Sequence, residues 1–424
     1  MHHGAARTCS ADLIDLMKAF RFAWAPVIAG AIACGSDPAA PPPSNNGNPG
    51  GNPPAMTVLG HGTITSRYTA EVWAHGGHAY TTTWGTRFAG GAGVSGNTMY
   101  IWSVSGATPV LLDSVTVENV NTLGDVQVSA DGRYLVVPTE RDPGSIITYD
   151  LSDPAKPREL SRFTSPKITR GVHTCEIQLV NGRLYAFLAV NGGDHPPRLM
   201  IVDLSDPANP TEVFTRDISG TFIHDVFVRD GILFTAEWNN GMVIFDIGGA
   251  GKGGTVANPV HMGSVRTVGG KVHNIWWFHD PSTDARRYAF VGEEGPATLF
   301  TTSSGDLHVV DVSDMSAPRE VAFLHVPGAG AHNFSMDEPN GFLYAAFYNA
   351  GVQVLDVRGD LSACSGQEKA ADGRCDLKAM GRVKAVGLAT ETTPVFVWGV
   401  HYTGTGLYAS DMLNGLWKLT PLSR

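Results

Sequence analysis

Short apolar runs that end in an aspartate recur along the chain. The runs end at Asp150, Asp203, Asp246, Asp311 and Asp356. In three copies a Ser-Asp turn follows and closes with a proline, at Pro157, Pro210 and Pro318. Proline removes a backbone donor, and Asp and Ser side chains bond the local backbone, so the strand stops and the chain reverses there. Repetition of this strand and turn predicts a β-repeat protein.

A second apolar strand follows the first strand of each repeat, as in GRLYAFLAV at residues 182–190. Aligned on these pairs, the innermost strands begin near Ala70, Gly124, His173, His224, His273, His332 and Trp398. The sequence therefore predicts an all-β, seven-bladed β-propeller, with six blades and an extra hairpin as the alternative. The last blade lacks one strand, which residues 61–68 (HGTITSRY) can supply. This would close the ring without an open sheet edge.

The strand LMIVD at residues 199–203, with its Ser-Asp-Pro turn, resembles the repeat of the bacterial LVIVD-repeat proteins. The resemblance extends over most of the chain after residue 57 and implies a β-propeller domain at residues 57–424. Members of that family are known as surface or secreted proteins without assigned chemistry. The resemblance therefore implies a fold and leaves the function open.

Composition supports many short strands and restricts the partners. The chain has 50 Gly, 26 Pro and 17% charged residues, which suits tight turns better than helices. Its net charge of −10 and the lack of any basic run exclude a nucleic-acid surface, which needs a basic face. We expect a monomer whose partner is an envelope protein, a glycan or a small molecule.

The N-terminal region has the pattern of an export signal. Basic residues near Lys18 precede an apolar stretch, residues 22–32, that is too short to span a bilayer. Small residues then lead to Cys34, in a pattern that resembles a bacterial lipobox. We interpret residues 1–34 as a misassigned upstream extension plus a lipoprotein signal peptide, with lipidation at Cys34. Ordinary signal cleavage is the alternative, and a cytosolic apolar helix is the third possibility.

Residues 35–56 are rich in Pro, Gly and Asn and have too little apolar surface to fold, so they predict a disordered tether. The expected location is the bacterial cell envelope, extracytoplasmic and lipid-anchored, at the outer membrane, in the periplasm or on the cell surface. Cysteine usage agrees with export. Cys364 and Cys375 bracket a short polar insertion and predict a disulfide, whereas Cys175 lies in an apolar alternation and predicts a buried thiol.

Four adjacent repeats carry a histidine at the start of the innermost strand: His173, His224, His273 and His332. In an antiparallel blade, the start of the first strand and the end of the second strand lie on one face. That face also carries the candidate ligand residues Glu140, Glu237, Glu293, Glu294, Trp398 and Asp411. Imidazoles and carboxylates are therefore predicted to converge on one mouth of the channel. Trp238, Trp276, Trp277 and Tyr348 could also line this mouth, although aromatic residues in strands more often form core.

Neutral imidazoles with neighbouring carboxylates can bind zinc, copper or iron. Such an ion could activate a water for hydrolysis or transfer electrons. Residues 222–238 are also similar to one blade of selenium-binding protein, a methanethiol oxidase with a seven-bladed propeller. That similarity implies roles for His224 and Glu237 only, with Glu237 as the candidate catalytic residue.

The structural alternative is that duplication copied four histidines that hydrogen-bond neighbouring blades. We therefore expect first a lipid-anchored propeller that binds a protein, glycan or small ligand on its channel face. A metal-dependent oxidoreductase or hydrolase is the second hypothesis, and an envelope scaffold is the third.

Overall fold

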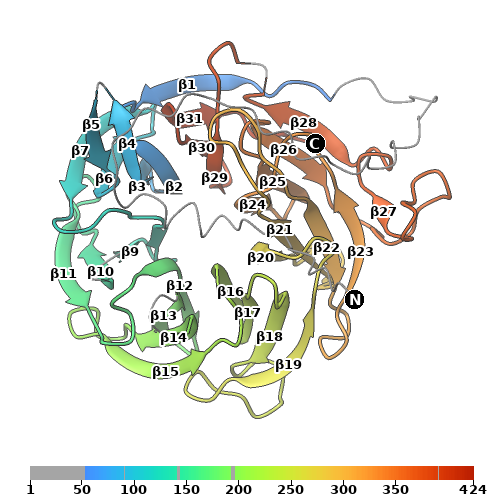
Figure 1. Ribbon diagram of the computed structural model, residues 1–424, viewed down its shortest axis with the longest axis horizontal. Coiled ribbons are helices and arrows are strands. Elements are labelled where there is room, and N and C mark those ends of the chain that lie inside the picture. The colour runs from blue at the N-terminus through green and yellow to red at the C-terminus, as the bar shows by residue number, and fades with distance from the viewer. Residues whose placement is uncertain (1–52, 90, 141–143, 192–195, 390) are drawn as a thin grey trace, which may run out of the picture. The chain divides into compact units, whose positions relative to one another are not determined.

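Seven blades, each built on four antiparallel strands, form a ring (Figure 1), and in one of them a short fifth strand is added at the outer edge. The computed structural model describes residues 53–89, 91–140, 144–191, 196–389 and 391–424. Within these residues the regular structure consists of strands. The prediction of a seven-bladed β-propeller is confirmed. The six-bladed alternative is wrong, because each of the seven inner strands belongs to a sheet of its own.

The first four blades follow the chain from the innermost to the outermost strand. Blade 1 contains β2 (Tyr68–His75), β3 (His78–Trp84), β6 (Thr98–Ser103) and β7 (Val110–Thr116). Blade 2 contains β8 (Gln127–Val128), β9 (Tyr134–Thr139), β10 (Ser145–Asp150) and β11 (Arg158–Phe163). Blade 3 contains β12 (Val172–Val180), β13 (Arg183–Val190), β14 (Arg198–Asp203) and β15 (Thr211–Asp217). Blade 4 contains β16 (Asp225–Arg229), β17 (Ile232–Ala236), β18 (Met242–Asp246) and β19 (Val260–Val265).

Blades 5 and 6 use the same order, and blade 7 does so except that its outermost strand is β1 (Val58–Thr63). Blade 5 contains β20 (Val272–Trp277), β21 (Tyr288–Glu293), β22 (Leu307–Asp311) and β23 (Arg319–Leu324). Blade 6 contains β24 (Phe334–Asp337), β25 (Phe342–Ala346), β26 (Val352–Asp356) and β28 (Val383–Gly387). Blade 7 contains β29 (Val397–Tyr402), β30 (Leu407–Asp411), β31 (Gly415–Leu419) and β1 (Val58–Thr63). A separate hairpin, β4 (Thr86–Ala89) and β5 (Ala92–Ser95), is inserted in blade 1.

An N-terminal strand closes the ring, but at a different place from the one expected. The strand β1 pairs antiparallel with β31, with Val58 opposite Leu419 and Thr63 opposite Gly415. The sequence predicted a closing strand at residues 61–68, which begins and ends later in the chain than β1. The partner of β1, β31, begins at Gly415, so the pairing ends at Thr63. Tyr68 already starts β2 of blade 1.

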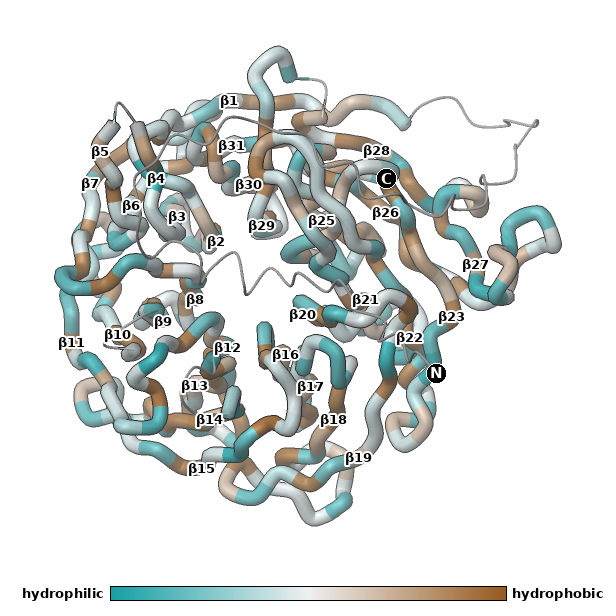
Figure 2. Tube along the Cα trace, viewed as in Figure 1, coloured by the Kyte–Doolittle hydropathy of each residue, from teal (hydrophilic) through white to brown (hydrophobic). Residues whose placement is uncertain are grey.

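Apolar residues between neighbouring blades form the core. Each of the seven blade-to-blade interfaces has its own cluster of buried residues. Between blades 4 and 5, for example, Phe234 packs on Trp277 with ring centroids 5.5 Å apart. Figure 2 shows the corresponding hydrophobic stretches along the strands of every blade. Because each blade covers the apolar face of the next, closing the ring leaves no blade face uncovered.

Side chains of the innermost strands also bond the neighbouring blade. The Asp125 carboxylate accepts from the backbone N–H of Cys175 at 2.8 Å, and Gln127 Oε1 accepts from the N–H of Ile177 at 3.0 Å. The Thr174 hydroxyl donates to the carbonyl of His224 at 2.7 Å. These bonds fix the height of one inner strand relative to the next.

Cys364 and Cys375 are joined by a disulfide, with Cα atoms 5.9 Å apart, and Cys175 is a buried free thiol. The disulfide loop leads into β27 (Cys375–Asp376), which pairs in parallel with β23 and covers the outer edge of blade 5. Among the described residues, no helix has the length and apolar character needed to cross a membrane.

Candidate metal centre

The four histidines of the inner strands meet at one end of the channel. His173 and His273 are the second residues of β12 and β20, whereas His224 and His332 lie just before β16 and β24. Successive rings touch around the axis, with centroids 4.2, 3.7 and 4.1 Å apart from His173 to His332. All four side chains are buried. Equivalent positions in four adjacent blades therefore build one cluster.

Glu140, at the end of the second strand of blade 2, orients the first histidine. Its Oε1 lies 2.8 Å from Nδ1 of His173, and Nε2 of His173 lies 2.8 Å from Nε2 of His224. Burial opposes a charge on His173, but Glu140 outweighs it and raises the pKa of His173. Burial and the neighbouring imidazoles lower the pKa of His224 well below its usual value. Two imidazole nitrogens this close need a shared proton or a cation between them, because two lone pairs would repel.

In the other two histidines, His273 and His332, one ring nitrogen has a lone pair that accepts no hydrogen bond from the described residues. His332 Nδ1 lies 2.6 Å from the carbonyl oxygen of Trp398, which only accepts, so Nδ1 carries the proton. Burial lowers the pKa of His332 to about 3, so the ring is neutral and its Nε2 has a lone pair. His273 Nδ1 faces the side-chain oxygen of Asn274 at 3.4 Å, and the same reasoning leaves a lone pair on its Nε2. Neither Nε2 atom has a hydrogen-bond partner among the described residues.

Glu294 brings a carboxylate to the cluster from blade 5. Its Oε2 lies 3.8 Å from Nε2 of His224, and its Oε1 accepts a hydrogen bond from the hydroxyl of Tyr348 at 2.7 Å. One donor atom each of His224, His273 and Glu294 lie within 4.8 Å of one another. Burial raises the pKa of Glu294. A cation beside this carboxylate would offset the cost of keeping its charge away from water.

Aromatic side chains enclose the imidazoles. Trp238 is stacked on His224 with centroids 5.7 Å apart, and Phe222 contacts the edge of His173 at 5.4 Å. Trp398 and Tyr348 contact His332 at 4.4 and 4.7 Å. Phe222 was not among the candidates from the sequence, since it precedes the inner strand and no repeat position singles it out.

Three of the candidate carboxylates have other partners. Glu237 Oε1 accepts from the Thr235 hydroxyl at 3.0 Å, and Asp411 accepts from the N–H of Phe396 at 2.9 Å. Glu293 is bonded to His308 at 3.2 Å. These groups hold turns within or beside their own blades. Of the candidates on this face, the structure thus brings Glu140, Glu294 and Trp398 to the imidazoles.

A second group of buried acids lies one residue further along the inner strands. Burial raises the pKa of Glu71 to about 8, of Asp125 to about 6 and of Asp225 to about 7. Glu71 accepts a hydrogen bond from the Asn333 amide, and Asp125 bonds the neighbouring inner strand as described above. This part of the structure fits the structural alternative, in which repeat residues connect the blades.

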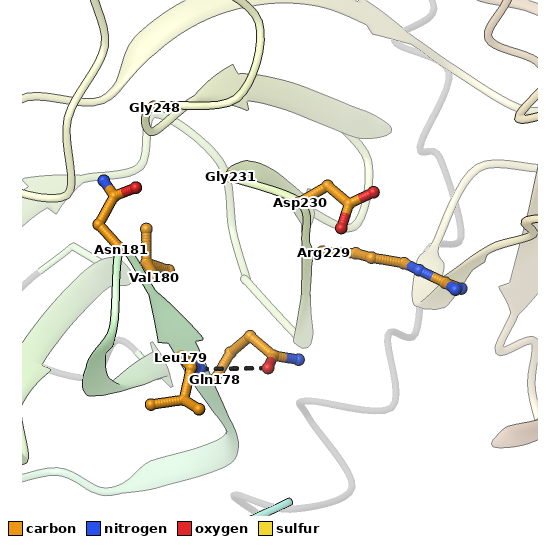
Figure 3. Close-up of a pocket in the computed structure, with 8 residues that line it drawn as sticks. All are labelled: Gln178, Leu179, Val180, Asn181, Arg229, Asp230, Gly231 and Gly248. Atoms are coloured by element: carbon orange, nitrogen blue, oxygen red, sulfur yellow. Dashed lines mark hydrogen bonds between the residues drawn. The ribbon is translucent and has the colours of Figure 1, made fainter.

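The opposite end of the inner strands carries a groove of about 430 Å³ between the hairpins of blades 3 and 4. Figure 3 shows its wall, with Gln178 bonded to the backbone of Leu179. Its charged side chains already have partners, because Arg229 bonds Glu338 at 2.9 Å and Asp230 bonds Arg286 at 2.8 Å. The groove is separated from the histidines by the length of the inner strands.

Comparison with protein families supports the repeat assignment. The model of the LVIVD repeat matches residues 175–217, 223–267 and 301–324. The chain contains LVIVD repeats. The matched segments cover blades 3 and 4 and the outer strands of blade 5. Of the four histidines only His224 lies inside them, so the repeat accounts for the scaffold and not for the cluster. A search of curated proteins finds no match.

The predicted lipidation site Cys34 and the predicted signal segment, residues 1–34, lie outside the described residues.

Proposed function

We propose that this LVIVD-repeat propeller is a binding protein whose ligand is a transition-metal ion, held at the histidine end of its channel. The observation that carries the proposal is the buried lone pair on His273 Nε2, which has no hydrogen-bond partner among the described residues, in a group where donor atoms of His224, His273 and Glu294 lie within 4.8 Å of one another. Leaving such a buried acceptor without a donor costs on the order of 1–3 kcal/mol. A metal ion held by His224, His273 and Glu294 would satisfy it and would replace the shared proton between His173 and His224.

The arrangement of the second ring nitrogens supports this proposal. Metal-binding histidines normally donate their other N–H to a carboxylate or a backbone carbonyl, which fixes the ring and its tautomer. Here Glu140 and the carbonyl of Trp398 have those positions. Donors that are imidazole nitrogens with one carboxylate suit zinc, copper or iron better than calcium or magnesium.

The cellular location belongs to the same proposal. We infer from the lipobox pattern that Cys34 is lipidated and that the propeller lies outside the cytoplasm, anchored to the cell envelope. Labelling with a radioactive fatty acid tests this step. The label should appear in the full chain and be lost in Cys34→Ala, and a labelled variant would refute the anchor.

Elemental analysis of the purified protein, prepared without chelator or metal-affinity tag, tests the metal. We expect about one zinc, copper or iron per chain, lost in a His224→Ala, His273→Ala double variant. His261→Ala is the matched control, since this histidine is exposed on an outer strand against Phe245 and should leave the metal content unchanged. Metal-free protein, even after incubation with each ion, would refute the proposal and favour a propeller that binds a protein, glycan or metal-free ligand.

A further inference from the structure

Two series of aromatic rings connect the buried His332 to Tyr68, which is partly exposed at the same end of the channel. The first series runs from His332 to Trp398, Trp84 and Tyr68, with ring centroids 4.4, 6.0 and 6.5 Å apart. Its members come from blades 6, 7 and 1. Every ring after the histidine is an indole or a phenol, the side chains that most easily lose one electron.

The second series starts at the same histidine and ends at the same tyrosine. It passes through Tyr348, Phe396 and Phe300, with steps of 4.7, 4.5, 6.1 and 5.5 Å. Two of its three intermediate members are phenylalanines, which do not give up an electron under conditions that oxidise tryptophan. The two routes therefore have similar packing and different chemistry.

The enclosure of the cluster suggests which chemistry a bound ion could perform. A hydrolytic metal keeps a position open for water and substrate. Here the imidazoles are at most 7% exposed and are covered by Trp238, Tyr348 and Trp398. Electron transfer needs no large substrate at the metal, only a small oxidant and a route to the surface.

We propose that the metal bound at the histidines is redox-active and that Trp398 and Trp84 carry oxidising equivalents from it to Tyr68. The inference rests on the metal site proposed above, with copper as the ion. This route would move a damaging oxidation away from the buried histidines to Tyr68, which is partly exposed and can be reduced by molecules in solution. Arg87 holds the end of the series in place, with its guanidinium 5.1 Å from the centre of the Tyr68 ring.

The oxidant of this reaction is a peroxide. Hydrogen peroxide takes up two electrons and two protons, its O–O bond breaks, and it leaves as two waters. One electron comes from the copper(I) ion, which becomes copper(II). The other comes from Tyr68 through Trp84 and Trp398, and the phenolic proton of Tyr68 passes to solvent. One proton taken from solvent completes the balance, and a tyrosyl radical remains at Tyr68.

The test mixes the copper(I)-loaded protein, without oxygen, with one equivalent of hydrogen peroxide. Electron paramagnetic resonance detects the radical, and spin trapping with peptide mass spectrometry locates it. We expect the trapped radical at Tyr68. Trp84→Phe, which keeps an aromatic ring but breaks the oxidisable route, should reduce the Tyr68 adduct to the level of copper-free protein and increase oxidation of the histidines. Phe300→Leu, on the other route, should leave the adduct unchanged.

Copper content is measured on the same samples, so the two proposals fail separately. An unchanged Tyr68 adduct in Trp84→Phe, or oxidation confined to the histidines in the unaltered protein, would overturn the electron route while leaving the metal site intact. Protein that takes up no copper would overturn the metal site, and the electron route with it.

Discussion

Replacing Glu140 by Gln should weaken metal binding without unfolding the propeller. The carboxylate lies 2.8 Å from His173 Nδ1 and is buried, so its charge acts on the ring with little screening by solvent. Glutamine keeps the size and a hydrogen-bonding oxygen but removes the charge that makes the imidazole a better donor. Loss of such a partner typically lowers metal affinity by 10–100-fold, or about 1.4–2.7 kcal/mol.

The pH of the measurement determines the sign of the result. Glu140 raises the pKa of His173, so near neutral pH it also favours the proton that competes with the metal. At a pH below that pKa, removing the Glu140 charge weakens the binding of the metal to His173 and also weakens the binding of the competing proton, so the two effects partly cancel. The dissociation constant should therefore be measured over a range of pH, and the two proteins compared on the alkaline side, above the raised pKa of His173, where no proton competes with the metal.

The assay is competition for Zn²⁺ or Cu²⁺ against a coloured chelator, with thermal unfolding as a check on the fold. Glu237→Gln is the matched control, because that carboxylate is equally buried but bonds Thr235 instead of a histidine. It should lower stability and leave the dissociation constant unchanged. Equal metal affinity of folded Glu140→Gln and the unaltered protein would show that Glu140 does not support a metal ligand.

Further predictions concern stability. Asp246 accepts four backbone N–H bonds that lower its pKa to about 2 despite burial, so Asp246→Asn should lose ~2–3 kcal/mol at neutral pH in urea unfolding. Because the folded pKa is depressed, this contribution is complete above about pH 4 and disappears toward pH 2, so variant and parent should converge there. Replacing Cys364 and Cys375 by Ser should cost ~2–3 kcal/mol by denaturant titration, and an equal midpoint would contradict it. Gly399→Ala would place Cβ 1.9 Å from a Glu71 oxygen, so calorimetry should show a loss of ~1–3 kcal/mol, and an unchanged melting temperature would mean that the carboxylate moves freely.

The repeat pattern predicted the blades because it is a local signal. Each apolar run ending in aspartate carries its own turn, and the same alignment placed His173 and His273 correctly within their inner strands. The closing strand was misplaced because its bounds depend on β31, more than three hundred residues away in the chain. Nothing within residues 58–68 records where that partner begins.

The ligand cluster was predictable in part for the same reason. The histidines repeat, so their convergence follows from the ring, but each carboxylate depends on a single side-chain rotamer. Glu293 and Glu294 are adjacent and chemically alike, yet one bonds His308 and the other approaches His224. Only the packing of blade 5 distinguishes them.

The closure of blade 7 has a consequence for how the protein reaches this fold. The sheet joins β1, among the first described residues to be synthesised, to β31, among the last. Until residues 415–419 have left the ribosome, β1 has no partner and exposes an edge that can pair with another chain. Ring closure is therefore a late, long-range event, and such pairings form slowly because the whole intervening chain must be ordered first. Premature termination directly before β31 would leave blades 1 to 6 able to form but the ring open.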